Sequence, residues 1–390
     1  MENESEVILL EVMEENVYLC ASQPIPTCMP TIIRKHSLNF HSRFIKLVCL
    51  LLLLHGEPAL HAQGHFRIME YNVENCFDTV RNVAVEDGDF TPHGAQRWNS
   101  GRYWKKLGRL ARVIAAAGGV TPVDLIGLVE IENDTVVRDL TDRTALARLG
   151  YDYVMTHGAD VRGINVALLY QPSRFRLLQS HSLPIYNQDA RKPLRDVLMV
   201  EGLLPTQDTL TVFLTHFPSR RGGVRATEAN RSSVATTLRE AVDSIQRSRP
   251  QAMIVVMGDF NAEVTEPCLA NDLNVCDFTS SATVFDASEL LETCVYSSRH
   301  SEVKGSYYYQ GAWNLIDHLF VSPNIVSGGA SLRADAESWQ IFDAQFLLEP
   351  YEHFGTKVHR PSRTYLGPHY HGGVSDHLPI VLSMELRFED

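Results

Sequence analysis

The feature that most constrains the fold is a short apolar run that ends in a glycine followed by polar residues. The run is Ile254-Val255-Val256-Met257-Gly258-Asp259-Phe260-Asn261. Its β-branched residues predict a buried strand, and the glycine frees the backbone to turn. A carboxylate beside a carboxamide suits a hard cation or a phosphate oxygen, since both need fixed acceptors and donors. A capping turn, in which Asp259 or Asn261 only bonds the next backbone amides, explains the same residues.

Other predicted strands also adjoin polar residues. Besides Asp259 and Asn261, these residues are Asn72, Glu130, His216, Asp317 with His318, and Asp376 with His377. Strand carboxyl ends in layered α/β folds converge on a cleft, so these groups are expected to meet there. Any one of them could be a helix cap, a surface turn or a hydrogen-bonded core histidine. Their joint occurrence favours a functional site.

Some of the predicted strands follow one another directly along the chain, whereas others alternate with helices. Helices are expected over 103–117, 135–149 and 227–245, and strands over 66–71, 123–129, 151–156, 165–170, 175–179, 197–203, 210–215, 254–257, 315–321 and 378–384. The first strand alternates apolar and polar positions, and a long irregular stretch precedes the last strand. This arrangement predicts a mixed-sheet α/β domain. No repeat or linker is visible, so residues 63–390 are expected to form one catalytic domain.

The N-terminal residues have the pattern of a secretory signal, with its core over 43–62. A basic segment, Arg43–Lys46, precedes the apolar run Leu47–Leu54 and a small-residue exit ending near Ala62. The run is too short to span a bilayer. Because residues 1–28 open with glutamates instead of basic residues, translation is expected to begin at Met29. We expect a periplasmic or secreted protein that keeps no stable membrane anchor once 1–62 are removed.

The chain is acidic, with a formal net charge of −12 at pH 7. The charge is −9 without residues 1–62, which hold four basic and seven acidic residues. This balance disfavours tight, sequence-blind binding to nucleic acid but allows a nuclease with a local basic cleft. Cys76, Cys268, Cys276 and Cys294 remain, an even number that permits disulfides, with Cys268 and Cys276 nearest in sequence. We expect these thiols to be structural.

The ordered set of strand-end motifs resembles the endonuclease/exonuclease/phosphatase superfamily, which includes deoxyribonuclease-I-like enzymes, neutral sphingomyelinases and inositol-polyphosphate phosphatases. The matching segments are Tyr71–Asn75, Gly127–Glu130, Thr215–Ser219, Gly258–Asn261, Leu315–His318 and Ser375–Pro379. The resemblance implies a four-layer α/β/β/α sandwich, two mixed β-sheets face to face with helices outside. It also implies Mg²⁺-dependent hydrolysis of a phosphoester, with Mn²⁺ or Ca²⁺ as alternative metals.

The same resemblance implies the roles of individual residues. Glu130 looks like the main metal ligand, with Asn72 beside it and Asp376 in support. His377 resembles the general base, oriented by Asp317. Asp259 resembles the residue that positions the attacking water or assists the leaving group. The remaining implied roles are a phosphate contact for Asn261 and, for His216, either a phosphate contact or proton donation to the leaving oxygen.

Basic residues near these motifs are candidates for binding the substrate phosphate. Arg220 and Arg221 follow His216 closely, and Arg195 belongs to a second patch with Arg191 and Lys192. Guanidinium groups suit phosphate, although solvated turns have the same composition. The stretch 339–371 mixes aromatic and basic residues, which could stack bases or cover the core.

We therefore expect a monomeric phosphodiesterase that acts on nucleic acid. Within the enzyme class, the alternatives are a phosphatase and a phospholipid phosphodiesterase of the sphingomyelinase kind. From another class, the alternative is an inactive family member that serves as a binding module. Fold alone does not choose among these substrates.

Overall fold

The computed structural model describes residues 64–186, 194–277, 291–293 and 296–388. The chain divides into two units, Met1–Leu60 and His61–Asp390, and all described residues belong to the second unit. The predicted signal segment, Arg191, Lys192 and Cys294 lie outside the described residues. Within the described ranges, no helix is both long enough and apolar enough to cross a membrane.

The first of two seven-stranded sheets has the order β14-β20-β1-β2-β4-β3, and β15 also pairs with β20. Its strands are β1 (Gly64–Cys76), β2 (Leu125–Ile131), β3 (Asp152–Met155), β4 (Asn165–Tyr170), β14 (Leu332–Arg333), β15 (Trp339–Ile341) and β20 (Ile380–Leu386). β1 and β2 are parallel, whereas β20 is antiparallel to β1. The carboxyl ends of β1 and β2 therefore lie beside the amino end of β20.

The second sheet has the order β5-β6-β7-β8-β13-β10-β9. Its strands are β5 (Arg176–Leu183), β6 (Val197–Leu203), β7 (Thr209–His216), β8 (Met253–Asp259), β9 (Val275–Asp277), β10 (Leu291–Thr293) and β13 (Asp317–Val321). β7 and β8 are parallel, and β13 runs antiparallel to β8. All seven residues of β8 are buried, as its apolar run predicts.

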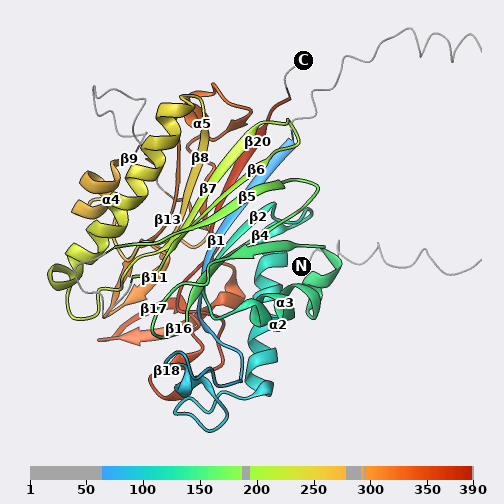
Figure 1. Ribbon diagram of the computed structural model, residues 1–390. Helices are drawn as coiled ribbons and strands as arrows, with labels where there is room; N and C mark the ends of the chain where they lie inside the picture. The colour runs from blue at the N-terminus through green and yellow to red at the C-terminus, as the bar shows by residue number, and fades with distance from the viewer. Residues whose placement is uncertain (1–63, 187–193, 278–290, 294–295, 389–390) are drawn as a thin grey trace, which may run out of the picture. The chain divides into compact units, whose positions relative to one another are not determined.

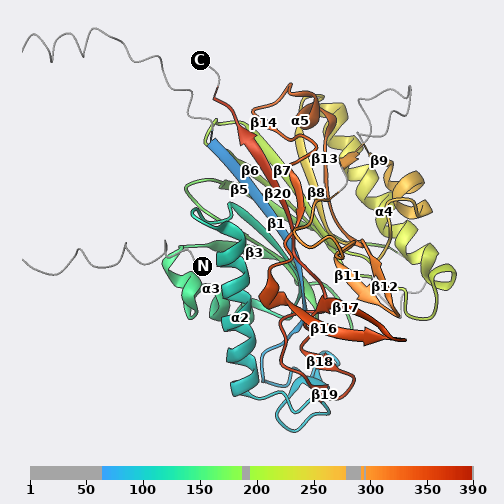
Figure 2. The same ribbon diagram turned by 180° about the vertical axis from the view of Figure 1, so that it is seen from behind.

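The two sheets pack face to face with helices outside, which confirms the predicted four-layer sandwich (Figure 1, Figure 2). Alternating residues of β7 and β8 separate into two groups. Leu214 and Met257 join the core shared with the first sheet, whereas Phe213 and Val256 pack under α4 (Val224–Ser248). The first sheet is covered by α2 (Ser100–Gly118) and α3 (Asp134–Asp142).

Several boundaries differ from the sequence predictions for identifiable reasons. α3 ends at Asp142, and the helical pattern resumes only as the 3₁₀ turn Ala145–Arg148, because Thr144 caps that turn through Leu146 N. The remaining helical segments are the 3₁₀ turns Gly88–Phe90 and Gln345–Leu347, the π-helix Cys268–Leu273 and α5 (Pro323–Ser327).

The stretch predicted to be irregular contains two hairpins, so that prediction was wrong. They are β16 (Leu348–His353) with β17 (Thr356–Pro361), and β18 (Tyr365–Leu366) with β19 (His369–Tyr370). A third hairpin joins β11 (Tyr307–Tyr309) to β12 (Ala312–Asn314). Strands this short, interrupted by Pro and Gly, carry little periodic signal. The β11–β12 and β16–β17 hairpins lie at the end of the sheets where β1 finishes (Figure 1).

Candidate active site

Three polar side chains form a row across the second sheet. His216 is the cross-strand partner of Asp259, and Asp259 is the partner of Asp317. Laterally paired residues point to the same face of a sheet, so all three project together at one end of the strands. Asp317 was grouped with the residues at strand carboxyl ends, but it begins β13. It meets the others because β13 is antiparallel to β8.

Near its carboxyl end, β8 itself has a backbone conformation that requires glycine. Gly258 has φ +149, and a Cβ at this position would lie 1.9 Å from the Thr215 carbonyl oxygen. The tight approach of β7 to β8 that this glycine allows sets His216 level with Asp259. Asp259 Oδ1 accepts a hydrogen bond from Asn261 N at 2.8 Å, so the capping interaction exists alongside the cluster.

His377 and Asp317 form a buried hydrogen-bonded pair. Nδ1 of His377 lies 2.7 Å from Oδ2 of Asp317, which also accepts a hydrogen bond from the Ser306 hydroxyl. Nε2 of His377 lies 4.0 Å from Oδ2 of Asp259. His377 was also grouped with the residues at strand carboxyl ends, but it precedes β20. Antiparallel pairing of β20 with β1 again explains why it reaches the cluster.

The first sheet contributes Asn72 and Glu130 to the same place. Asn72 Nδ2 donates to Oδ2 of Asp259 at 3.0 Å, which joins the ends of β1 and β8 across the two sheets. Glu130 Oε1 lies 3.9 Å from Nε2 of His216, and Glu130 Oε2 accepts from Asn75 N at 2.7 Å. Glu130 has φ +68, an uncommon conformation for a non-glycine residue that is concentrated at functional sites.

Glu70 is a buried member of the cluster that the sequence did not reveal. Apolar and polar positions alternate along β1 in the sequence, but both faces of the strand are covered and Glu70 is fully buried. Glu70 shares its face of the strand with Asn72 two residues later. Neither carboxylate oxygen has a hydrogen-bond partner within the described part of the chain.

Burial and mutual repulsion shift the carboxyl groups towards their protonated forms. Burial, and then the charges of Asp317 and Asp259, raise the pKa of Glu70 well above its usual value. Burial, and then the charge of Asp317, raise the pKa of Asp259 to about 7. Buried carboxyls that crowd together without compensating cations resist ionisation. This end of the sandwich therefore attracts positive charge.

The two histidines shift in opposite directions. Burial opposes the charged form of His377, but the charge and hydrogen bond of Asp317 and the charge of Asp259 outweigh it and raise the pKa well above 6.5. Burial, and then the positive charges of Arg195 and Arg162, hold the pKa of His216 well below 6.5. These shifts favour the charged form of His377 and the neutral form of His216.

Two sets of residues could hold a metal ion. Asp259, Asp317 and His377 each offer a ligand atom, and these atoms lie within 4.8 Å of one another. In that set, however, Nδ1 of His377 and Oδ2 of Asp317 are already engaged in a hydrogen bond with each other. The second set is Glu130, which is partly exposed, and Asn72, which is buried and whose Oδ1 accepts from Glu74 N at 2.9 Å. The oxygen donors of the second set suit a hard cation better.

Two of the three predicted phosphate-binding arginines lie beside the cluster, and both have protein partners. Arg195 is paired with Asp160 at 3.1 Å and donates to the His216 and Phe217 carbonyls. Arg220 bonds the Asn261 carbonyl at 2.7 Å and pairs with Glu266. Arg221 lies in the exposed turn before α4.

Several other candidates have structural partners. Asp376 forms an ion pair with Arg363 at 2.7 Å, and Asn261 Nδ2 donates to the Phe217 carbonyl at 3.2 Å. His318 is a core histidine, hydrogen-bonded to the Ala262 carbonyl. Burial raises the pKa of Cys76 to about 12 and that of Cys268 to about 11, as structural thiols require. Cys268 is a free thiol and does not form a disulfide with Cys276.

The sequence also did not reveal several residues that are distant in the chain but contact the cluster residues in the folded protein. Ser306 and Tyr307 contact the His377–Asp317 pair, with the Tyr307 and His377 ring centroids 4.7 Å apart. Arg162 donates to Asn75 Oδ1 at 3.4 Å. Arg162 and Ser306 lie in loops, where periodicity gives no signal. A row of tyrosines at 307–309, close before Asp317, was the one visible sign.

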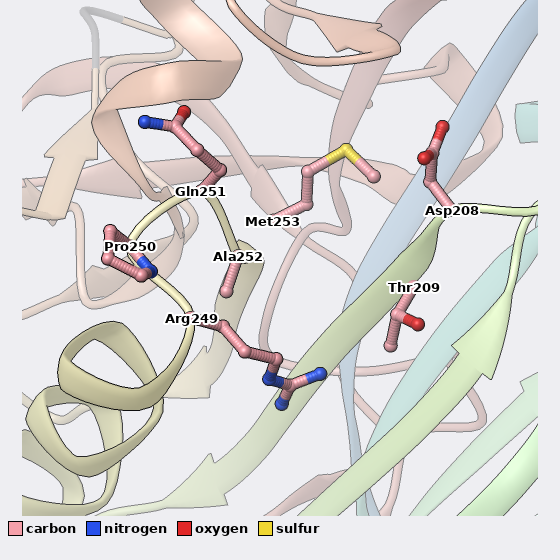
Figure 3. A pocket seen from close by; sticks show the side chains of 7 residues that line it. All are labelled: Asp208, Thr209, Arg249, Pro250, Gln251, Ala252 and Met253. Carbon is pink, nitrogen blue, oxygen red and sulfur yellow. The ribbon is translucent and has the colours of Figure 1, made fainter.

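A separate surface pocket lies at the opposite ends of the same strands. It is lined by Asp208, Thr209, Arg249, Pro250, Gln251, Ala252 and Met253 (Figure 3). These residues begin β7 and β8, whereas His216 and Asp259 end them, so roughly 20 Å separates the two places. Arg249, the basic residue that lines this pocket, forms an ion pair with Glu201. The pocket is therefore not part of the acid–histidine cluster.

The fold and the cluster define a class: a layered α/β protein with the acid, amide and imidazole groups of a hydrolase at one end of two packed sheets. The profile of the Endonuclease/Exonuclease/phosphatase family matches residues 67–386. The chain belongs to this family, whose members include nucleases, phosphatases and phosphodiesterases and hydrolyse phosphoesters. No curated protein matches the chain.

Solved structures share the fold at low sequence identity. An endonuclease/exonuclease/phosphatase from Bacteroides vulgatus is 14% identical, with 83% of this chain and 100% of that chain covered and a TM-score of 0.50. A Bacteroides thetaiotaomicron mannosyl-6-phosphatase is 17% identical (83% and 100% covered, TM-score 0.49). D. rerio TDP2 complexed with a single-strand DNA product is 15% identical (82% and 99% covered, TM-score 0.47).

Proposed function

We propose that this protein is a metal-dependent phosphodiesterase that cleaves nucleic acid. The observation that carries the proposal is the row of His216, Asp259 and Asp317, completed by His377 from the segment before β20. Together these residues supply a proton acceptor, a residue that orients it and groups that contact an anion. All of them lie within one buried cluster.

His377 is the general base in this proposal. Asp317 fixes the Nδ1 proton, which leaves the Nε2 lone pair facing Oδ2 of Asp259 at 4.0 Å. A water between these two atoms loses its proton to Nε2 as it attacks phosphorus. Because neighbouring carboxylates keep His377 charged, the base becomes available when pH rises above its pKa or when positive charge enters the site.

His216 contacts the substrate phosphate and does not protonate the leaving oxygen. The sequence left both roles open. The lowered pKa of His216 makes the neutral imidazole the dominant form, which is a poor acid but a good hydrogen-bond donor. Arg162 and Arg195, whose charges lower that pKa, add positive potential for the anion.

Glu130 and Asn72 are the proposed metal ligands, with Mg²⁺ as the expected ion and Mn²⁺ or Ca²⁺ as substitutes. Mg²⁺ keeps several waters and takes only one or two protein carboxylates, which fits this small donor set. The excess of buried carboxyl groups, with Glu70 and Asp259 shifted towards protonation, also fits a site that needs a cation. A bound divalent ion would neutralise the nonbridging phosphate oxygens.

The proposal also includes export of the chain, because the apolar run Leu47–Leu54 follows basic residues and precedes small ones. Expression in a bacterial host, followed by fractionation and N-terminal sequencing, tests it. Recovery of a periplasmic protein that begins near Gln63 is expected. Recovery of the full chain in the cytoplasm would contradict it.

A chelator-controlled assay tests the reaction. Protein stripped with EDTA is supplied with Mg²⁺ and plasmid DNA, bis-p-nitrophenyl phosphate, p-nitrophenyl phosphate or sphingomyelin. DNA and the diester should be hydrolysed only after Mg²⁺ returns. His377→Ala should abolish the reaction, whereas His181→Ala, on an exposed strand position, should not. Hydrolysis of the monoester or of sphingomyelin alone would overturn the nuclease proposal.

A further inference from the structure

The β11–β12 hairpin presents its tyrosines on two different faces. A two-residue turn, Gln310-Gly311, joins the strands with φ +47 and +87, the positive values that a tight type I′ hairpin requires. Side chains alternate along β11. Tyr307 and Tyr309 therefore share one face, and Tyr308 takes the other.

The Tyr308 face anchors the hairpin to the rest of the domain. The Tyr308 ring packs edge-on against Trp313, with centroids 5.3 Å apart, and against Tyr351 of β16 at 6.1 Å. A Cβ at Gly311 would lie 2.4 Å from the His353 ring, so the turn rests on the neighbouring β16–β17 hairpin. These contacts hold the opposite face of β11 in a fixed position.

The other face is a ladder of three rings that starts at the proposed base. The Tyr307 centroid lies 4.7 Å from that of His377, and a backbone bridge joins the same two residues. The Tyr309 ring is nearly parallel to Tyr307, at 16°, with centroids 6.1 Å apart. Tyr309 is 53% exposed, and the residue opposite it on β12 is only Ala312. The outer ring therefore offers an uncovered aromatic surface.

We propose that Tyr309, supported by Tyr307, is a stacking subsite for a nucleobase one or two nucleotides from the phosphate that is cleaved. A planar base continues the offset stack of rings and gains affinity without sequence-specific hydrogen bonds. Gln310 Nε2 donates to the Tyr309 hydroxyl at 3.3 Å, so the rim beside the ring is polar. A polar rim around a flat ring suits a base better than an acyl chain.

This inference rests on the proposed function, because it assumes that the substrate is nucleic acid. The inference assigns to Tyr309 the binding of a base by stacking and no part in the chemical step. The matched variants are Tyr309→Ala, which removes the ring, and Tyr309→Phe, which removes only the hydroxyl. The matched ligands are a thymidine hexanucleotide and a hexamer of the same phosphates carrying tetrahydrofuran in place of every nucleoside.

The test combines calorimetric binding in EDTA, where no cleavage occurs, with cleavage of both hexamers in Mg²⁺. For the thymidine hexamer, Tyr309→Ala should weaken binding and raise KM roughly tenfold, with kcat retained. Its binding to the base-free hexamer should not change, and Tyr309→Phe should behave as the unaltered protein.

Two results would overturn the inference, and they differ in what they leave standing. If the unaltered protein cleaves DNA but Tyr309→Ala affects both hexamers equally, or neither, the subsite is refuted and the nuclease proposal stands. If the unaltered protein neither binds nor cleaves either hexamer, the nuclease proposal fails and the subsite fails with it.

Discussion

Replacing Asp317 with asparagine perturbs one contact at the centre of the proposed mechanism. The Asp317 carboxylate lies 2.7 Å from Nδ1 of His377 and is fully buried. A hydrogen bond to a charged partner contributes about 1.5–3 kcal/mol, which corresponds to roughly 10- to 150-fold in rate. If the asparagine amide donates to Nδ1, the ring proton moves to Nε2 and the base is lost, a change that costs on the order of 10⁴ in comparable triads.

We therefore expect kcat of Asp317→Asn to fall by roughly 10- to 10⁴-fold. The pH profile supplies a second readout. His377 must be neutral to act, so activity of the unaltered protein should rise with pH through the raised His377 pKa, above 6.5. Because Asp317 is the main cause of that rise, any activity left in the variant should have its acid limb at lower pH.

Asp343→Asn is the matched control. Asp343 is also fully buried and lies 3.0 Å from Nδ1 of a histidine, His300. Within the described residues, no hydrogen bond or ion pair joins His300 to the cluster. The kcat of this variant should stay within about twofold of the unaltered value, as expected for a change outside the site. The reasoning is refuted if Asp317→Asn keeps kcat within a few-fold, or if its acid limb does not move to lower pH.

Three further predictions concern the metal, the carboxyl cluster and the fold. Glu130→Gln should weaken Mg²⁺ binding roughly tenfold or more, measured as activity against Mg²⁺ concentration; an unchanged dependence would remove Glu130 as a ligand. The pKa of Asp259 is raised to about 7 in the folded protein, so its stabilising effect is complete below its unfolded value and is lost as pH rises through 7. Asp259→Asn should therefore be inactive yet melt no lower than the unaltered protein at pH 8, and a clearly lower melting temperature would contradict this. Lys106 bonds Glu74 O, Thr364 Oγ1 and Val374 O from a buried position; Lys106→Met should cost about 3 kcal/mol in urea unfolding, and a loss below about 1 kcal/mol would contradict the buried network.

The sequence was sufficient to predict the main strands and the residues at their ends. In a layered α/β protein, a continuous apolar run such as β8 predicts a buried strand. The polar residues beside such runs can be identified from the sequence alone. Asp259 and His216 were expected to meet, and they do, because β7 and β8 are parallel. The sequence did not establish strand direction. Asp317 and His377 reach the cluster from the beginnings of their strands.

What escaped prediction depends on tertiary contacts. The alternation of apolar and polar residues along β1 does not reveal that Glu70 is buried in the folded protein. The β11–β12 hairpin has strands of only three residues, too short for periodicity to identify. Ser306 and Tyr307 act on a histidine about 70 residues later in the chain, and their relation to it exists only in the folded protein.

The location of a bound divalent ion tests the central claim most directly. Crystals grown with Mn²⁺ and a phosphorothioate dinucleotide allow the ion to be located from its anomalous scattering. We expect one peak within ligand distance of Glu130 and Asn72 and next to the phosphorothioate, with His377 Nε2 facing phosphorus. A peak between Asp259, Asp317 and His377, or no peak at this end of the sheets, would contradict it.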